Sequence, residues 1–417
     1  MRDRSREPAG GDGSAGFIAE LHGVRGIALA LVVLFHVFGQ GRVSGGVDVF
    51  LFFSGFLLTG SMFRRSVAGQ TGRVTRHYAR TLLRLAPAAV TVLAAVVAAI
   101  LLLRPLASQG DDLREVRASL LYYQNWELIW SQLSYGAAGP NASPLQHFWS
   151  MSLQGQFFLV WPWCVVALVS LGMRGGRDPW RIAVLGTSLI TATSFLIAQV
   201  MVRSDQPVAY FHTASRWWEL TLGGLLALVL MRWNLPSLLR PWAGWTGLVI
   251  VVAGGFVVNG GTVFPGPWVL LPLTGAALVL LGAGASGGPR GVLQTRPLTR
   301  LADIAYELYL WHWPILIFLL VIQDREVVGP RSGVFVVVVS TAAAGITHTV
   351  ISRPLGRAKA ARRARVLWSV GAVLTAAAVL SSALAVQVDR SVQRTLAASY
   401  VAEDYPGAEA VRNPSLS

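Results

Sequence analysis

Long apolar runs divide this chain of 417 residues and set narrow limits on its fold. Hydrophobic residues make up 53% of it and charged residues only 13%, against about 25% charged in ordinary soluble domains. About 20 consecutive apolar residues cross a bilayer as a helix, so each apolar run near that length is a candidate span. The predicted spans are 24–38, 47–63, 85–103, 148–171, 182–202, 217–231, 245–258, 268–281, 304–322, 334–350 and 366–384. We therefore expect an all-α, polytopic transmembrane bundle of about 11 spans.

The cations alternate between the predicted loops, which indicates an orientation. Lys and Arg are retained on the cytoplasmic side of short loops, and an inside N-terminus places most of the 35 Lys and Arg residues there. We expect a multi-pass protein of the cell membrane, with its C-terminus extracytoplasmic. This asymmetry also accounts for the net charge of +15, and no basic soluble domain indicates nucleic-acid binding. The single cysteine, Cys164, lies in an apolar run, so no intramolecular disulfide forms.

Arg25 and His36 lie at the two ends of the first apolar run. Eleven residues of helix turn through about 1,100°, so the two side chains share one face and stand about 16 Å apart along the axis. Ionisable groups inside a bilayer are costly and usually face a bundle interior or a polar cavity. The pair predicts a channel with a cation at its mouth and an imidazole further in. The alternative is that Arg25 anchors the inner surface and His36 is an interfacial histidine with satisfied hydrogen bonds.

Polar residues also enter the second, fourth, sixth and ninth spans, the ninth carrying Tyr306, Glu307, Tyr309 and His312. In the second span, Asp48 and Ser54 are candidates for a polar site, although small residues such as Ser54 and Gly55 also serve close helix packing. The fourth span opens with several hydrogen-bonding groups that need partners in a bundle or cavity. Arg216 and Glu219, at the start of the sixth span, can pair with each other at i and i+3, so a structural ion pair is as reasonable as a substrate contact.

Six ordered motifs resemble the acyltransferase 3 family of integral-membrane O-acyltransferases over residues 17–357. They read ELHGVRGIALALVVLFH, GGVDVFLFFSGFLLTG, RTLLRLAP, HFWSMSLQGQFFLVWP, YFHTASRWWELTLGGLLA and YELYLWHWP. The family hallmark is an Arg and a His separated by ten residues on the first span, matched here by Arg25 and His36. The resemblance implies a ten-span acyltransferase core, to which this chain adds one C-terminal span.

The resemblance implies transfer of an acyl group, often acetyl, from cytoplasmic acyl-CoA to a hydroxyl of a sugar, a cell-envelope glycan or a macrolide-like product. Acyl-CoA would be a co-substrate, with no bound cofactor and no metal. Arg25 is expected to bind the donor and His36 to act as general base. Residues expected to contact the substrates are Arg80, Arg84, Ser54, His147, Ser150, Gln154, Gln156, Arg216, Glu219, Tyr306, Tyr309 and His312. For Arg80 and Arg84 an anchoring role is equally open.

Three positions depart from the pattern of many relatives. His22 replaces an acid near the motif arginine, Gln154 and Gly155 replace two Glu, and Ala305 stands where Ser is frequent. These changes remove the carboxylates that could orient His36. Asp48, beyond the same hairpin, is then the nearest candidate, and we expect it to complete the catalytic set.

We expect four parts along the chain. They are a disordered cytoplasmic leader (1–16), the membrane acyltransferase domain (17–357), a basic cytoplasmic loop with an extra span (358–386), and a short extracytoplasmic tail (387–417). The tail resembles the start of the linker that joins some relatives to an SGNH-hydrolase-like domain, so a partner of that type is expected unless the gene is shortened. The longest external segment, 104–146, contains a stretch that suits a helix lying at the outer interface.

Two other classes of function fit the same composition. A multi-span transporter or flippase could place Arg25 and His36 in a transport pathway, and a catalytically silent scaffold could explain the altered fourth-span motif. An acyltransferase turns over acyl-CoA, whereas a transporter or flippase would show no such turnover. If the protein is a silent scaffold, replacement of His36 by alanine should leave the phenotype unchanged.

Overall fold

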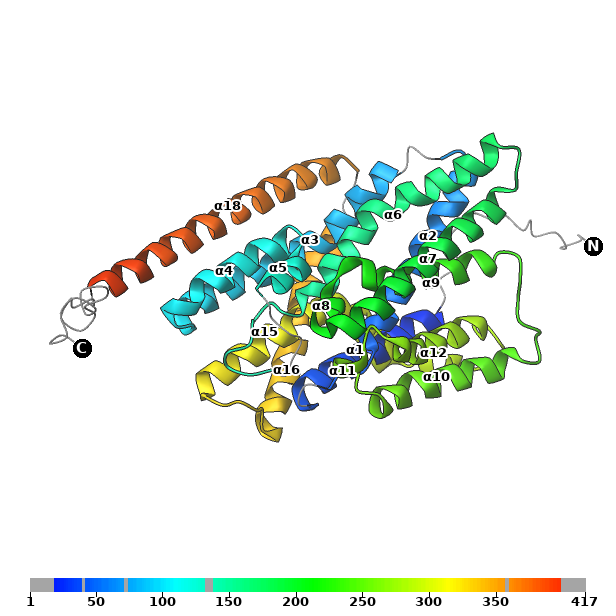
Figure 1. The fold of residues 1–417 in the computed structure, drawn as a ribbon. Helices are drawn as coiled ribbons and strands as arrows, with labels where there is room; N and C mark the ends of the chain where they lie inside the picture. The colour runs from blue at the N-terminus through cyan, green and yellow to red at the C-terminus, as the bar shows by residue number, and fades with distance from the viewer. Residues whose placement is uncertain (1–18, 40–41, 71–73, 132–137, 357–359, 399–417) are drawn as a thin grey trace, which may run out of the picture.

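The computed structural model describes residues 19–39, 42–70, 74–131, 138–356 and 360–398, and within them it contains helices and no strand. The principal helices are α1 (Ala19–Phe38), α2 (Gly46–Val67), α3 (Val74–Leu103), α4 (Leu106–Leu120), α5 (Gln124–Trp130), α6 (Phe148–Arg174), α7 (Pro179–Ser204), α8 (Gln206–Phe211), α9 (Thr213–Val229), α10 (Arg240–Val257), α12 (Leu270–Leu281), α14 (Arg296–Asp303), α15 (Ala305–Gln323), α16 (Pro330–Thr347) and α18 (Ala360–Ala398). Figure 1 shows the long helices as a bundle with α18 at its edge, beside α4.

The all-helical membrane fold is confirmed, but the count of eleven spans is not. Eight described helices are long and apolar enough to cross a membrane: α1, α2, α3, α6, α7, α15, α16 and α18. The predicted spans 217–231, 245–258 and 268–281 do form helices, α9, α10 and α12, of 17, 18 and 12 residues. They are not among the eight, because short helices interrupted by glycine do not reach the length or apolarity of a full span.

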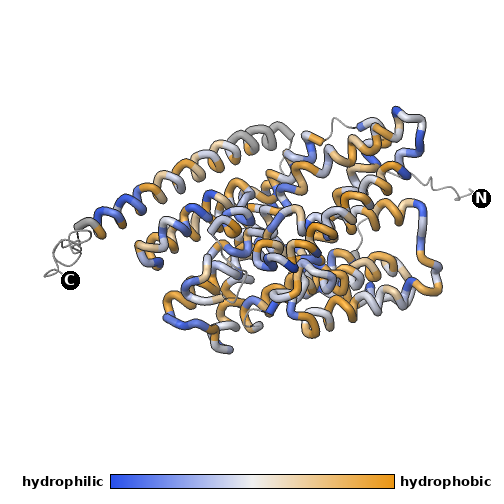
Figure 2. The backbone as a smooth tube through the Cα atoms, in the orientation of Figure 1, coloured by the Kyte–Doolittle hydropathy of each residue, from blue (hydrophilic) through white to orange (hydrophobic). Residues whose placement is uncertain are grey.

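Large apolar side chains on the outward faces of the long helices are exposed. On α7, Leu185, Leu189 and Leu196 are each more than 60% exposed, and Figure 2 shows hydrophobic residues along this helix. In a soluble protein such a continuous apolar surface would be a liability. In a bilayer it is the surface that contacts lipid.

Helix α2 lies at the centre of the bundle and packs closely along α9. A Cβ on Gly55 would overlap the carbonyl of Leu220, and a Cβ on Gly223 would overlap that of Phe52. Only glycine allows the two backbones to approach this closely, as is typical of membrane helix pairs. The structure thus bears out close packing at Gly55, while the neighbouring Ser54 faces away from α9 into a cavity.

The predicted interfacial stretch within 104–146 folds into two helices instead of one. Helix α4 ends at Leu120, and α5 begins at Gln124 after a turn in which Tyr122 has a φ of 59°. A left-handed residue of this kind interrupts helical hydrogen bonding. Side chains then join the two helices, since Gln124 donates a hydrogen bond to Glu115.

Glu115 also accepts a hydrogen bond from Ser143, in the loop before α6. Glu115 is only 5% exposed. Burial raises the pKa of its carboxyl from 4.5 to about 8, although the hydrogen bond from Ser143 acts in the opposite direction. A protonated carboxyl group therefore joins α4 and α5 to the loop that leads to His147.

The α2 and α9 contact predicts a specific loss of stability. We expect Gly55→Ala to lower the free energy of unfolding by about 1–3 kcal/mol, since the added methyl group forces two packed backbones apart. Gly345→Ala is the matched control, because Gly345 is helical and its Cβ would meet no atom within 4 Å. Its stability should stay equal or rise by up to about 1 kcal/mol from helix propensity. Thermal unfolding in detergent measures both, and equal Tm values would contradict the packing account.

Glu115 predicts a pH dependence of stability. Between pH 4.5 and about 8 the folded protein holds a proton on Glu115 that the unfolded chain has lost. The stabilisation from Glu115 is therefore complete below pH 4.5 and declines as the pH rises through this window. Denaturation at several pH values should show the decline in the wild type and a flatter profile in Glu115→Gln. Glu326→Gln, an exposed acid in the loop between α15 and α16, should keep the wild-type slope, and a Glu115→Gln profile identical to wild type would exclude this role.

Candidate active site

A cavity of about 430 Å³ lies between α1, α2, α3, α6 and α15. On α2 its wall includes Val47, Phe50, Ser54, Leu57 and Ser61. These positions repeat every three or four residues, so they occupy one face of the helix. Over fourteen residues this face extends for about 21 Å. The cavity is therefore elongated along α2.

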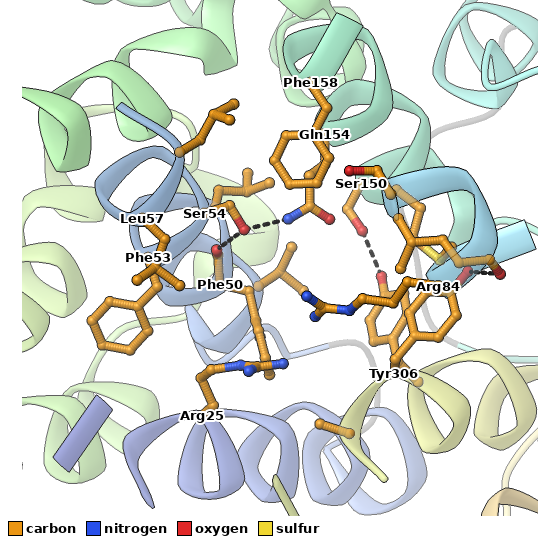
Figure 3. Close-up of a pocket in the computed structure, with 18 of the residues that line it drawn as sticks. Arg25, Phe50, Phe53, Ser54, Leu57, Arg84, Ser150, Gln154, Phe158 and Tyr306 are labelled. Atoms are coloured by element: carbon orange, nitrogen blue, oxygen red, sulfur yellow. Dashed lines mark hydrogen bonds between the residues drawn. The ribbon is translucent and has the colours of Figure 1, made fainter. Parts of the chain in front are cut away.

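Two arginines enter the cavity, Arg25 from α1 and Arg84 from α3, and Figure 3 shows both side chains directed into it. The guanidinium carbon of Arg25 lies 5.9 Å from the centre of the Phe50 ring. None of the described lining residues is an aspartate or a glutamate. Arg84 is exposed and Arg25 is partly exposed, so this end of the cavity reaches the surface. Two cations without a lining carboxylate make this end suited to an anion.

Uncharged polar groups follow the arginines along the cavity. The Ser54 hydroxyl donates a hydrogen bond to the Phe50 carbonyl at 2.8 Å and accepts one from Gln154, as Figure 3 shows. The Tyr306 hydroxyl donates to the Leu85 carbonyl at 2.9 Å. These bonds connect α2 to α6 and α15 to α3, so they fix the relative positions of the four walls.

At its buried end the cavity meets Ser150 and Tyr309, whose hydroxyl oxygens lie 2.7 Å apart. The Tyr309 hydroxyl also donates to the backbone carbonyl of His147 at 2.8 Å. Tyr309 therefore joins the cavity to a group of three histidines, His36, His147 and His312, which we call the histidine cluster.

Within the histidine cluster, His36 Nδ1 lies 2.8 Å from His312 Nε2. The ring of His147 lies 5.6 Å from that of His312, centre to centre. His147 and His312 are 1% and 0% exposed, whereas His36 is partly exposed. The sequence predicted that Arg25 and His36 line one channel; the structure places Arg25 in the cavity wall, whereas His36 is not a lining residue and is joined to Tyr309 at the buried end through His312.

Asp48, Arg216 and Glu219 form a separate ion cluster that is almost completely buried. Arg216 donates to Asp48 Oδ1 at 2.9 Å and to Glu219 Oε1 at 2.6 Å. Its guanidinium group also lies over the ring of Trp149, 5.0 Å from the centre. The predicted pairing of Arg216 with Glu219 is therefore present, and the carboxylate expected to orient His36, Asp48, instead binds Arg216.

The two remaining predicted residues do not line the cavity. Gln156 donates to Asn125 and accepts a hydrogen bond from Thr213 at 2.7 Å, so it joins α6 to α5 and α9. Arg80 is exposed and lies outside the lining residues. His77 and Thr81, which were not predicted from the sequence, also line the cavity. Both lie on the helical face of Arg84, at i−7 and i−3, so extending that periodicity backwards would have found them.

The altered fourth-span motif also has a structural explanation. A Cβ at Gly155 would overlap the ring of Tyr122, the residue with positive φ between α4 and α5. Glycine at this position lets the turn pack directly against α6. Ala305, the other small replacement, lies in the cavity wall.

Comparison with known proteins matches residues 18–350 to the family described as acyltransferase domain. The relatives include YrhL of Bacillus subtilis, provisionally named a peptidoglycan O-acetyltransferase, at 28% identity over 74% of this chain and 50% of that protein. The peptidoglycan O-acetyltransferase OatA of Listeria monocytogenes is 24% identical over 72% of this chain and 49% of OatA. The chain spans about half the length of the curated relatives it matches. No solved structure matches it.

The ion cluster predicts a large effect of a single substitution. Arg216→Met should lower the free energy of unfolding by about 3–5 kcal/mol, because two buried carboxylates lose their cation. Arg232→Met is the matched control. Arg232 pairs with Asp178 at the surface, with exposed fractions of 49% and 28%, and such pairs contribute about 0–1 kcal/mol. Thermal unfolding in detergent measures both variants, and a small effect of Arg216→Met would contradict a structural role for the cluster.

Proposed function

Because this chain belongs to the acyltransferase domain family, which its match over residues 18–350 establishes, we propose that it transfers an acyl group, most simply acetyl, from acyl-CoA to a hydroxyl. The named relatives favour a cell-envelope glycan, and in particular peptidoglycan, as acceptor. The observation that carries the proposal is the elongated cavity with two arginines at its open end and the histidine cluster beside its buried end.

The donor is an elongated molecule with a polyanionic end and a thioester end, and the cavity matches that distribution of charge. Arg25 and Arg84 would hold phosphate oxygens, since guanidinium groups bind them with paired hydrogen bonds. The pantetheine arm would follow the face of α2 past Ser54, which extends for about 21 Å. The thioester would then reach Ser150 and Tyr309. With the N-terminus inside, as the distribution of cations predicts, the donor enters from the cytoplasm.

The acceptor hydroxyl would approach His36, the partly exposed member of the histidine cluster. A neutral imidazole is well suited to remove a proton near pH 7. As His36 takes the proton, the acceptor oxygen attacks the thioester carbonyl carbon. The carbon–sulfur bond then breaks, and the proton passes from His36 to the leaving sulfur, giving the ester and free CoA thiol.

A further extracytoplasmic component is part of the proposal. The curated relatives are about twice as long as the stretch matched here, so an SGNH-type domain or partner could receive the acyl group and complete the transfer. The acceptor tested first can therefore be a soluble muropeptide or such a partner, since each offers a hydroxyl group.

Two substitutions test the roles of Arg25 and His36. Arg25→Ala should raise the KM for acetyl-CoA about tenfold or more with a smaller change in kcat, because it removes a donor contact present throughout the reaction. His36→Ala should lower kcat by about 10²–10⁴-fold with little change in KM, since it removes the general base. Thiol release from acetyl-CoA by purified protein, with and without soluble muropeptides, measures both constants.

Arg76→Ala is the matched control for charge. Arg76 is exposed near the start of α3 and does not line the cavity, so its variant should keep wild-type constants. Thiol release that stays absent for every acyl donor and acceptor, from protein with a normal unfolding transition, would refute the acyltransferase proposal. Release that is equal in wild type and His36→Ala would refute the role of His36.

A further inference from the structure

The protonation of His312 can be read from its two hydrogen-bond partners. Its Nδ1 lies 3.1 Å from the backbone carbonyl oxygen of Leu308, one turn earlier on α15. A carbonyl oxygen accepts hydrogen bonds and cannot donate one. Nδ1 of His312 must therefore carry a hydrogen. In a neutral imidazole the other nitrogen then carries a lone pair, so Nε2 is an acceptor.

The acceptor nitrogen of His312 points at His36. The two nitrogens lie 2.8 Å apart, the ring planes differ by only 8°, and the ring centres are 5.2 Å apart. These values describe two nearly coplanar rings that meet through their nitrogens, not one ring lying over the other. His36 Nδ1 must then donate to His312 Nε2. The lone pair of the neutral His36 ring is consequently on Nε2.

A doubly protonated His312 would reverse this assignment, but its surroundings oppose a positive charge. His312 is 0% exposed, and the rings around it are His147, Tyr309 and His36. The buried acids Asp48 and Glu307 have other partners, Arg216 and His348. An imidazolium held only by backbone carbonyls and aromatic rings, with no carboxylate beside it, would bear most of the cost of burial.

We infer that His312 is a positioning residue that fixes the tautomer and orientation of His36, so that Nε2 of His36 is the atom that takes the proton from the acceptor hydroxyl. This inference rests on the proposed function of His36 as general base. The series of hydrogen bonds runs from the Leu308 carbonyl through His312 to His36. It assigns His312 a role other than the substrate contact expected from the sequence.

His312 also gives Nδ1 of His36 the hydrogen-bond acceptor that the carboxylates replaced in this sequence would have given it. In the catalytic triad a carboxylate accepts the Nδ1 hydrogen of the histidine and so selects the tautomer with a basic Nε2. His312 Nε2 accepts the same hydrogen here while remaining neutral. When Nε2 of His36 gains a proton, the Nδ1 hydrogen bond to His312 becomes charge-assisted and strengthens.

The first test is the tautomer itself, and it does not depend on activity. The chain has seven histidines, so nitrogen NMR of protein labelled with ¹⁵N-histidine can resolve them, with His36 assigned by its loss in His36→Ala. Near pH 7.5 we expect His36 to carry its hydrogen on Nδ1. In His312→Leu the hydrogen should move to Nε2, the site that a neutral histidine in water prefers. A hydrogen on Nε2 of His36 in the wild type would overturn the inference.

The second test is kinetic and compares two replacements of His312. His312→Leu removes the acceptor and should lower kcat by up to about 10⁴-fold, the loss found when a triad histidine loses its tautomer control, while the KM for acetyl-CoA stays within about twofold. His312→Gln offers an amide oxygen as acceptor and an amide hydrogen for Leu308. It should recover at least about tenfold of the lost kcat.

Trp311→Phe is the control for packing. Trp311 is adjacent on α15 and donates its indole hydrogen to Thr347 at 2.9 Å, so the variant loses one hydrogen bond outside the histidine cluster and should keep wild-type kcat. Equal kcat per folded molecule in wild type and His312→Leu would overturn the positioning role. If the wild type keeps the Nδ1 tautomer but no donor is turned over, the geometry stands and the proposed acyl transfer is what fails.

Discussion

The close contact between α2 and α9 is the interaction on which the rest of the structure depends. Glycines bring the two backbones together, and Asp48 of α2 binds Arg216 of α9, which also holds Glu219. Inside a membrane an unpaired charge or polar group has no water to solvate it. The pairing therefore fixes both the distance between the helices and the rotation of α2 about its axis.

That rotation decides what α2 presents to the rest of the bundle. Ser54 and Gly55 are neighbours in sequence and point about 100° apart, so one lines the cavity while the other packs against α9. The face of α2 turned about 100° from α9 is thereby available over about four turns as the wall of an elongated site. A single helix thus supplies the tight packing of the bundle and the long side of its cavity.

Helix α15 connects this cavity to the histidine cluster. Tyr306, Tyr309 and His312 follow at steps of three residues, and each step falls about 60° short of a full turn. Tyr306 therefore lies in the cavity, His312 lies in the histidine cluster, and Tyr309 between them contacts both. The carbonyl of Leu308, four residues before His312 on the same helix, lies where it can set the protonation of His312.

The sequence by itself determined the membrane class, the helical fold, and Arg25 and His36 as an ionisable pair on one helical face, because apolar length and helical period are local properties. It also identified several polar residues of the cavity wall, among them Ser54, Gln154 and Tyr309, but not His77 or Thr81. Only the tertiary structure decided their partners: Asp48 with Arg216 instead of His36, and His36 with His312, 276 residues away. Such pairings depend on how separate helices are rotated and spaced, and a period read along one helix carries no information about the rotation of its neighbour.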